Sequence, residues 1–320
     1  MQSAGRRSAA RAQLFGATVL SGLMAVLARM ANIAEGGFSG GQNTLVRFVI
    51  GTVFCLAIFA ARPGSFQPVN PRMLATRGIV GGVSVLLYFY ALSRIPAVEA
   101  TLLNSLFPLL ATLMASFVLR ERPTVHLVIA LLITSTGIVM VLGIGAPGGL
   151  GMGQLAGFAS AFLSAGAILS IRALRADHNA ATIFFAFCVG GLVVSSPFAL
   201  QTWQHSPQAW ALAGASAFAG VGSHLLMTQS FGALTVPEAA VWQQLAPVNS
   251  CLWAVPLLDE RLQWTKLVGV LCVTIGVVYG ALKPSRGASR GASSGEQHGH
   301  AARHHIRRRA SPARRHRARA

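Results

Sequence analysis

The pattern of hydrophobic positions along the chain predicts ten membrane-spanning helices. Apolar stretches cover residues 13–30, 45–61, 78–92, 98–119 and 127–145, and then 155–171, 182–200, 210–231, 236–258 and 267–282. Their lengths lie near the roughly 20 residues that a helix needs to cross about 30 Å of hydrocarbon. Because a backbone in lipid must satisfy its own hydrogen bonds, helices are expected throughout. The predicted fold is an all-α integral membrane protein.

A glycine-rich segment with one proline divides the predicted helices into two sets of five. The expected organisation is a cytoplasmic N-terminus (1–12), a first five-helix repeat (13–145), a linker (146–153), a second five-helix repeat (154–282) and a disordered basic tail (283–320). The tail combines Ala, Gly, Ser, Arg and His without apolar periodicity, which is typical of segments that do not fold.

The two sets of helices are related in sequence. An offset of 139 residues aligns Gly81 with Gly220, Ser84 with Ser223 and Pro108 with Pro247, and about 16 of 66 positions from Arg77 to Leu142 are identical without gaps. Each half has an odd number of predicted helices, so the second half enters the membrane from the opposite side. This pattern predicts an inverted-topology repeat, which suits a transporter that opens alternately to the two sides.

Composition supports a membrane protein and argues against a soluble one. Hydrophobic residues make up 53% of the chain and charged residues only 11%, with a mean hydropathy of +0.57. The net charge of +18 comes largely from the tail, where 11 of the 26 basic residues lie. We expect those residues to rest on anionic lipid head groups, with a nucleic-acid or scaffold role as the alternative. The four cysteines lie in apolar stretches, so neither a disulfide framework nor a metal site is expected.

The distribution of basic residues predicts the orientation. With the N-terminus inside, 21 basic residues face the cytoplasm, Arg77 among them, and five face outward, including Arg47. Both termini are therefore expected in the cytoplasm, and the protein is expected in a plasma membrane or a bacterial inner membrane.

The candidate binding residues follow from polar groups inside the predicted helices. Pro108 and Pro247 fall at mid-helix and free the carbonyls of Asn104 and Gln243, which also carry side-chain amides. In lipid such groups are costly unless they face another helix or a wet cavity. We expect them to face the axis of the bundle; a proline kink with polar neighbours that serve only packing is the alternative. Further candidates for the cavity wall are Arg47, Tyr88, Tyr90, His224, Gln229, Trp242 and Gln244.

Three titratable residues are candidates for proton or cation coupling. Glu99 and Glu238 lie within a turn of the start of equivalent helices, where they either carry a proton or cation or cap the helix. His224 lies deep in the eighth predicted helix and titrates near neutral pH, although a hydrogen-bonded packing role is equally consistent with its position. Arg47 either attracts an anionic solute or extends to lipid head groups.

Two segments carry a family resemblance. The chain reads YFYALSRIPAVEATLLNSLFPLLATLMASFVLRER from Tyr88 to Arg122 and SFGALTVPEAAVWQQLAPVNSCLWAVPLLDERL from Ser230 to Leu262. Each has a small-residue turn, a proline about halfway along the next helix, and a Leu-x-Glu-Arg ending. In these features the chain resembles the drug/metabolite transporter superfamily, in its ten-helix branch of two EamA-type units.

The resemblance implies two inverted five-helix bundles around a cavity lined mainly by the third, fourth, eighth and ninth helices. It also implies that Arg47, in LVRFVIG, corresponds to the family's arginine at the start of the second helix. We therefore expect a secondary transporter of a small polar metabolite, without a cofactor, with a homodimer as one expected assembly. The chain has no GxxxxGK[ST] segment for ATP. The alternative is a membrane-embedded enzyme or flippase acting on a lipid-linked substrate.

Overall fold

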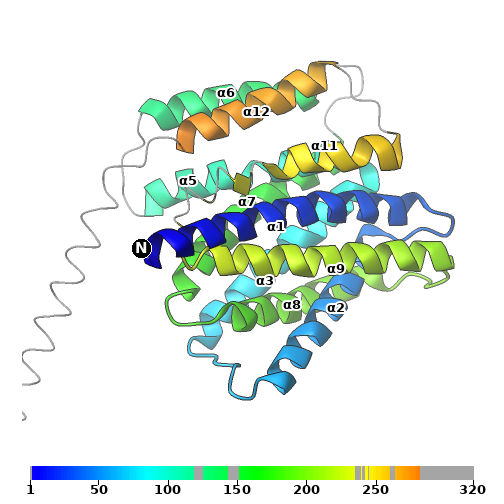
Figure 1. The fold of residues 1–320 in the computed structure, drawn as a ribbon. Helices are drawn as coiled ribbons and strands as arrows, with labels where there is room; N and C mark the ends of the chain where they lie inside the picture. The colour runs from blue at the N-terminus through cyan, green and yellow to red at the C-terminus, as the bar shows by residue number, and fades with distance from the viewer. Residues whose placement is uncertain are drawn as a thin grey trace, which may run out of the picture. The chain divides into compact units, whose positions relative to one another are not determined.

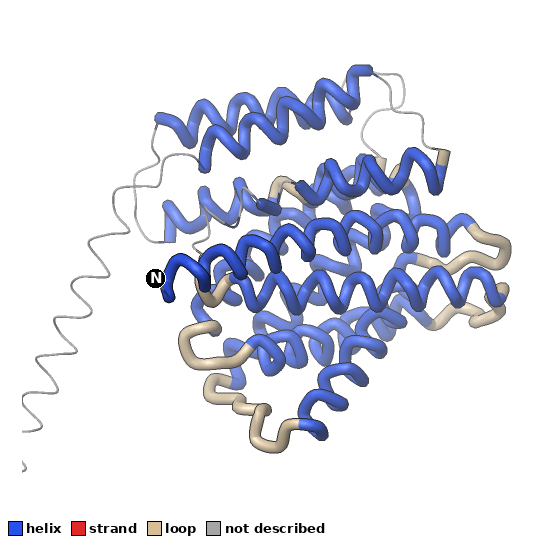
Figure 2. The backbone as a smooth tube through the Cα atoms, in the orientation of Figure 1, coloured by secondary structure: helices blue, strands red, loops and turns tan. Residues whose placement is uncertain are grey.

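The computed structural model describes most of the chain before the tail. The described residues are 2–118, 125–142, 151–234, 239, 242–243, 245–259 and 264–281, and all belong to one unit, residues 1–282. Within these ranges the regular structure is entirely helical (Figure 2). The prediction of an all-α fold is confirmed for this part of the chain.

The helices follow one another with short connections (Figure 1). Up to the linker they are α1 (Gln2–Ile33), α2 (Gly40–Ala61), α3 (Pro71–Arg94), α4 (Ala97–Asn104), α5 (Phe107–Val118) and α6 (Val125–Leu142). After it come α7 (Met152–Leu174), α8 (Ala180–Ser195) with the short 3-10 helix η1 (Ser196–Ala199), α9 (Pro207–Ser230), α11 (Leu245–Leu258) and α12 (Trp264–Ala281).

Several helices begin before the apolar stretch that predicted them, because a polar residue caps them. Ser39 and Gln42 form a capping box at α2, in which each side chain accepts the other's backbone N–H. Asn70, Asn179 and Ser206 accept a backbone N–H from the first turns of α3, α8 and α9. These caps satisfy N–H groups that have no partner inside the helix.

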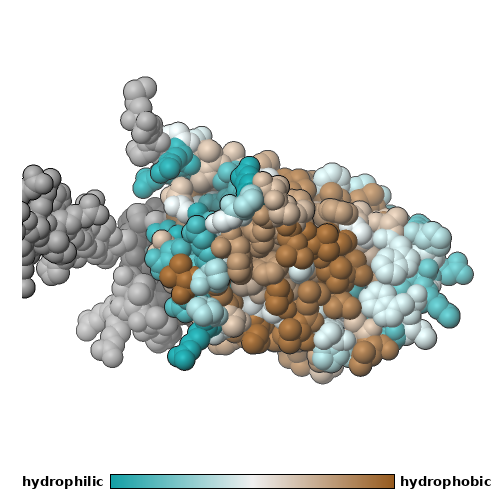
Figure 3. All heavy atoms as spheres, turned by 90° about the horizontal axis from the view of Figure 1, so that it is seen from below, coloured by the Kyte–Doolittle hydropathy of each residue, from teal (hydrophilic) through white to brown (hydrophobic). Residues whose placement is uncertain are grey.

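The helices present a surface suited to lipid. Six of them are long and apolar enough to cross a membrane, namely Gly5–Ile33, Gly40–Ala61, Pro71–Arg94, Met152–Leu174, Ala180–Ala199 and Pro207–Ser230, and three further apolar segments are shorter. Figure 3 shows apolar residues around the middle of one face and hydrophilic residues toward both ends. Large exposed side chains such as Val53, Phe162 and Val193 belong to this apolar surface. Burial in a bilayer removes that surface from water.

The fourth predicted helix is interrupted, which the apolar pattern did not show. We expected one helix over residues 98–119; instead α4 ends at Asn104 and α5 starts at Phe107. Pro108 is the second residue of α5, where a missing N–H leaves no helical hydrogen bond unmade. The prediction that Pro108 lies within a continuous helix is therefore wrong, because the chain breaks the helix rather than kinking it.

Helices from the two halves pack against each other in pairs. The most extensive pairs are α1 with α9, α6 with α12, α3 with α7, and α3 with α8 (Figure 1). In the α3–α8 pair the backbones touch, since a Cβ atom on Gly190 would lie 2.3 Å from the carbonyl carbon of Gly78. Only glycine permits this approach, as at other close contacts between membrane helices.

Loop contacts define the two ends of the bundle. At one, the Phe38 end, the Phe38 ring stacks on His205 at 3.9 Å between centroids. At the other, the His178 end, His178 Nε2 accepts the backbone N–H groups of Val69 and Asn70 at 3.1 and 3.3 Å. α1 ends and α9 begins at the Phe38 end, whereas α7 ends and α3 begins at the His178 end. Both pairs are therefore antiparallel.

Candidate functional site

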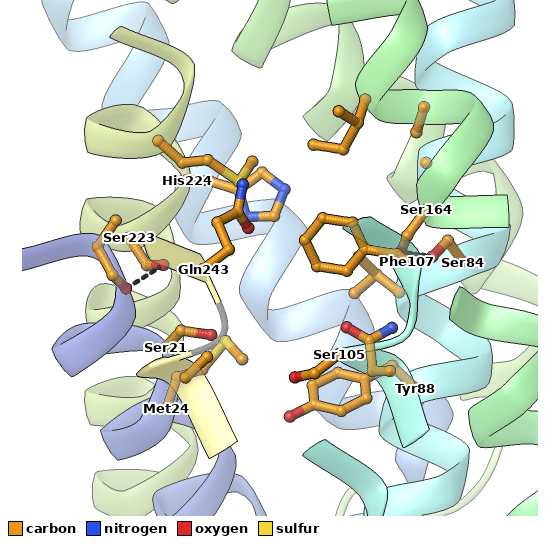
Figure 4. A pocket seen from close by; sticks show the side chains of 18 of the residues that line it. Ser21, Met24, Ser84, Tyr88, Ser105, Phe107, Ser164, Ser223, His224 and Gln243 are labelled. Atoms are coloured by element: carbon orange, nitrogen blue, oxygen red, sulfur yellow. Dashed lines mark hydrogen bonds between the residues drawn. The ribbon is translucent and has the colours of Figure 1, made fainter. Parts of the chain in front are cut away.

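A cavity of about 110 Å³, lined by both polar and apolar side chains, lies between the helices of the bundle. Its wall comes from α1, α2, α3, α4, α5, α7, α8 and α9, with Gln243 and Ala246 completing it. Figure 4 shows His224 and Gln243 on one side of the space and Phe107, Ser84 and Ser164 on the other. The volume has room for several water molecules, and hydroxyls and amides of the wall are suitable partners for water or a polar solute.

Arg47 is the first of two buried cations in the cavity wall, and it contacts His224. Arg47 is 4% exposed, and its Nη2 lies 3.0 Å from His224 Nδ1 and 3.4 Å from the carbonyl oxygen of Gly220. Its Nη1 contacts the sulfur of Met24. A guanidinium only donates hydrogen bonds, so His224 Nδ1 is the acceptor and the imidazole is neutral in this arrangement.

Arg77 is the second buried cation in the wall. It is 3% exposed, and its Cζ lies 4.5 Å from the centroid of the Phe187 ring. The His224 ring stacks on the same phenyl ring at 4.6 Å and 4°. Arg77 Nε and Nη1 are buried without a hydrogen-bond partner among the described residues. The two arginines thus belong to one cluster with Phe187 and His224.

Hydroxyl and amide groups form the rest of the polar wall. The Tyr88 hydroxyl pairs with Thr101 Oγ1 at 2.9 Å, and Tyr88 and Ser105 lie together in Figure 4. Ser84 Oγ donates to the Ser160 carbonyl at 2.9 Å. Asn104 Nδ2, at the break between α4 and α5, donates to Ser160 Oγ at 2.8 Å. These neutral groups provide hydrogen bonds without further charge.

The structure brings five of the predicted site residues together. Those that line the cavity are Arg47, Tyr88, Asn104, His224 and Gln243. Five others lie outside its lining: Tyr90, Pro108, Gln229, Trp242 and Pro247. Gln244 and Glu238 lie outside the described residues.

Helix geometry accounts for the residues that fail to reach the cavity. Tyr90 follows Tyr88 by two residues, which places it on the opposite side of α3, where Arg94 lies over its ring at 5.3 Å. Gln229 is exposed near the end of α9, so an amide there needs no cavity. Trp242 packs against the apolar cluster around Leu14 and Phe231. The expectation that Tyr90, Gln229 and Trp242 line the cavity is wrong for these positions.

Glu99 lies beside the site and not in its wall. It is buried in the first turn of α4, and its Oε1 accepts a hydrogen bond from Gln154 Nε2 at 3.0 Å. A carboxylate in this position is stabilised by the N-terminal end of the helix dipole. This hydrogen bond joins α4 to α7 and does not cap α4, so the capping and coupling alternatives both stay predictions.

Sequence reasoning missed Arg77 and assigned it to the cytoplasmic loop. That assignment is wrong, because α3 begins at Pro71 and carries Arg77 into the bundle as a buried residue. A signal was present: Arg77, Gly81, Ser84 and Tyr88 follow a spacing of four, three and four, which places them on one face of a helix. All four line the cavity.

The fold and the cavity define a multi-pass membrane protein with a polar interior site. The family model of the EamA-like transporter family matches residues 12–143 and again residues 151–280. The chain belongs to this family of membrane transporters, within the drug/metabolite transporter superfamily, and it is not an enzyme. The expected family resemblance is confirmed.

Known proteins of similar sequence and fold agree with this assignment. The pseudopaline exporter CntI of Pseudomonas aeruginosa is 23% identical over 264 residues, which cover 82% of this chain and 91% of that protein. An uncharacterized transporter of Helicobacter pylori is 27% identical over 198 residues, covering 57% and 64%. A solved crystal structure has a TM-score of 0.64 at 24% identity over 86% of this chain and 97% of its own. That last similarity shows the fold alone.

Proposed function

We propose that the protein is a secondary transporter that carries a small polar metabolite by alternating access, through ten membrane spans arranged as two inverted five-helix repeats. The observation that carries the proposal is the cavity with polar side chains in its wall, which takes Arg47, Tyr88 and Asn104 from the first half and His224 and Gln243 from the second. A cavity shared by two related halves is the arrangement in which inverted repeats bind their solute.

Three features support the inverted repeat. The family model matches each half separately. Packing partners exchange between the halves: α1, the first helix of one half, pairs with α9, the third of the other, and α3 pairs with α7 in the same way. Ser84 and Ser223, equivalent under the 139-residue offset, each donate to a carbonyl across one of these pairs, at Ser160 and Ala17. The domain boundaries remain a prediction.

The positions of the arginines support cytoplasmic termini. Among the described residues from α1 to α9, and apart from Arg47 and Arg77 in the cavity wall, the His178 end and the start of α1 carry seven arginines and the Phe38 end carries two. The seven are Arg6, Arg7, Arg11, Arg62, Arg72, Arg172 and Arg175; the two are Arg29 and Arg94. Positively charged loops stay on the cytoplasmic side, so we place the His178 end there. Lipid contacts of the basic tail and a homodimer remain predictions.

Proton coupling remains a weaker proposal. His224 is the hydrogen-bond acceptor of Arg47 and therefore neutral in this state, and Glu99 lies outside the cavity wall. Glu238 lies outside the described residues. Solute flux in liposomes with and without an imposed pH gradient tests the proposal, and equal flux under both conditions removes it.

Substitution of Gln243, whose amide lies in the cavity wall, tests the proposed binding site. The purified protein is reconstituted in liposomes, and uptake of labelled amino acids, nucleosides, sugars and small organic acids is measured against preloaded unlabelled solute. For any solute that is carried, Gln243→Ala is expected to weaken uptake, because the 8%-exposed Gln243 amide lies in the cavity wall. Gln229→Ala is the matched control, since Gln229 is exposed near the end of α9.

Three outcomes separate the possibilities. Loss of uptake in Gln243→Ala and not in Gln229→Ala supports the site. Equal affinity and rate in both variants refutes it while leaving transport intact. If no solute of any class crosses, the proposed function itself fails.

The relative CntI is named an exporter, so export is the direction to measure first. Deletion of residues 284–320 is expected to leave the flux intact.

A further inference from the structure

The cavity contains more positive charge than its described surroundings balance. Arg47 and Arg77 both line it, and no Asp or Glu belongs to the lining among the residues that the structure describes. Removing a guanidinium from water is costly unless an anion or strong acceptors replace the water. Two such groups in one small cavity require an explanation.

The two arginines differ in how far the protein satisfies them. Arg47 is held by the Gly220 carbonyl oxygen and His224 Nδ1, so its position is fixed by α9. Arg77 lies against the face of Phe187, while its buried Nε and Nη1 have no hydrogen-bond partner within the described ranges. Phe187 covers one face of this guanidinium, and no described acceptor balances its charge in the way that Gly220 and His224 serve Arg47.

The depth of the two arginines along their helices also favours a ligand in the cavity. Arg47 follows the start of α2 at the Phe38 end by seven residues, and Arg77 follows the start of α3 at the His178 end by six. At 1.5 Å per residue each lies about 10 Å inside the bundle, from opposite ends. A ligand in the cavity therefore has a cation within reach whichever end is open.

We propose that the transported solute carries an anionic oxygen group, a carboxylate or a phosphate, which Arg77 binds through its guanidinium and Arg47 supports through the shared cluster. Two parallel N–H donors of a guanidinium match two oxygens of either group. The neutral wall formed by Ser84, Tyr88 and Gln243 then contacts the uncharged part of the solute. This inference rests on the proposed transport function and narrows its substrate class.

Matched pairs of solutes test the charge requirement without any mutation. The melting temperature of the detergent-purified protein is measured with succinate against succinamide, and with glycerol 3-phosphate against glycerol, at equal ionic strength. Ligands that bind the folded state raise this temperature. The charged member of at least one pair is expected to stabilise the protein and its neutral partner is not. The two pairs distinguish a carboxylate from a phosphate, and either result supports the inference.

Substitutions of two arginines on α3 test whether the anion binds at Arg77. Arg77→Gln is expected to weaken binding of the stabilising anion by about 10- to 100-fold, the loss typical of a hydrogen bond between charged groups. Arg77→Lys keeps the positive charge but loses the paired N–H donors of the guanidinium. Its affinity for the anion is therefore expected to lie between those of the wild type and Arg77→Gln. Arg72→Gln is the matched control, because Arg72 is exposed on the same helix. Size-exclusion chromatography and the unliganded melting temperature establish that each variant is folded.

Several results would overturn the inference. It fails if neither anion stabilises the wild-type protein, if charged and neutral members act equally, or if Arg77→Gln binds the anion as well as Arg72→Gln does. Uptake in liposomes separates this failure from that of the transport function. Flux of neutral or cationic solutes that survives Arg77→Gln refutes the anion requirement alone, whereas absence of flux for every solute refutes transport.

Discussion

Replacement of His224 by phenylalanine separates its hydrogen bond from its ring contact. In the structure Nδ1 lies 3.0 Å from Arg47 Nη2, and the imidazole stacks on Phe187 with ring centroids 4.6 Å apart and an interplanar angle of 4°. Phenylalanine keeps a flat ring against Phe187 and removes the acceptor. The variant therefore leaves one donor of a buried guanidinium without its partner.

The expected loss of stability follows from that single donor. A hydrogen bond to a charged group contributes about 1.5–3 kcal/mol, and an unpaired buried donor loses that contribution. Arg47 keeps the Gly220 carbonyl oxygen at 3.4 Å and the contact with Met24, so the loss is limited to one partner. We expect His224→Phe to lower the free energy of unfolding by about 2 kcal/mol.

His224→Asn is the complementary variant. The side-chain oxygen of asparagine is attached at the same position as Nδ1 of histidine, so it retains an acceptor for Arg47 and loses the ring. It should lose the aromatic contact, about 0.5–1.5 kcal/mol, together with the burial of the ring atoms that asparagine lacks. Denaturant unfolding in lipid–detergent micelles gives both values. The reasoning is refuted if His224→Phe is as stable as the wild type.

Three further predictions concern packing and capping. Gly190→Leu should destabilise the protein by at least about 1–3 kcal/mol, because any side chain there meets the backbone of α3; Gly214→Leu, where nothing lies within 4 Å, is the control in the same melting assay. His178→Phe should lower the free energy of unfolding by about 1–3 kcal/mol, since the backbone N–H groups of Val69 and Asn70 both lose their acceptor, and limited proteolysis of residues 62–70 should become faster. Glu99→Gln keeps an oxygen for Gln154, so uptake and its dependence on a pH gradient should remain unchanged; a lost dependence would restore Glu99 as a coupling residue.

Much of the fold could be predicted from the apolar pattern, because hydrocarbon imposes a length and a helical backbone on any segment that crosses it. The boundaries of the helices could not be predicted from this pattern. Apolar windows mark only the part of a helix inside hydrocarbon, whereas α3 begins at Pro71 because Asn70 caps it. The break before Pro108 was hidden for a similar reason, since apolar residues continue on both sides of it.

The site was predictable to the extent that a polar group in lipid must find a partner. That argument pointed to Asn104 and Gln243, which line the cavity, and to Gln229, which lies near a helix end and is exposed. It missed Arg77 because an arginine at the edge of an apolar stretch looks like a loop residue that orients the protein. Depth along the helix and the direction of the side chain decide between these cases, and both depend on packing between distant helices.

The hydrogen bonds between helices indicate which parts of the bundle move together. Ser216 and Ser223 of α9 donate to the Met24 and Ala17 carbonyls of α1, at 2.9 and 2.8 Å. Across the cavity, Ser84 of α3 donates to the Ser160 carbonyl of α7 at 2.9 Å. Figure 4 shows α1 and α9 side chains on one side of the space and α3 and α7 side chains on the other. Each wall of the cavity therefore combines helices from both halves of the chain. Under the alternating access proposed above, these exchanged helix pairs are the bodies expected to move.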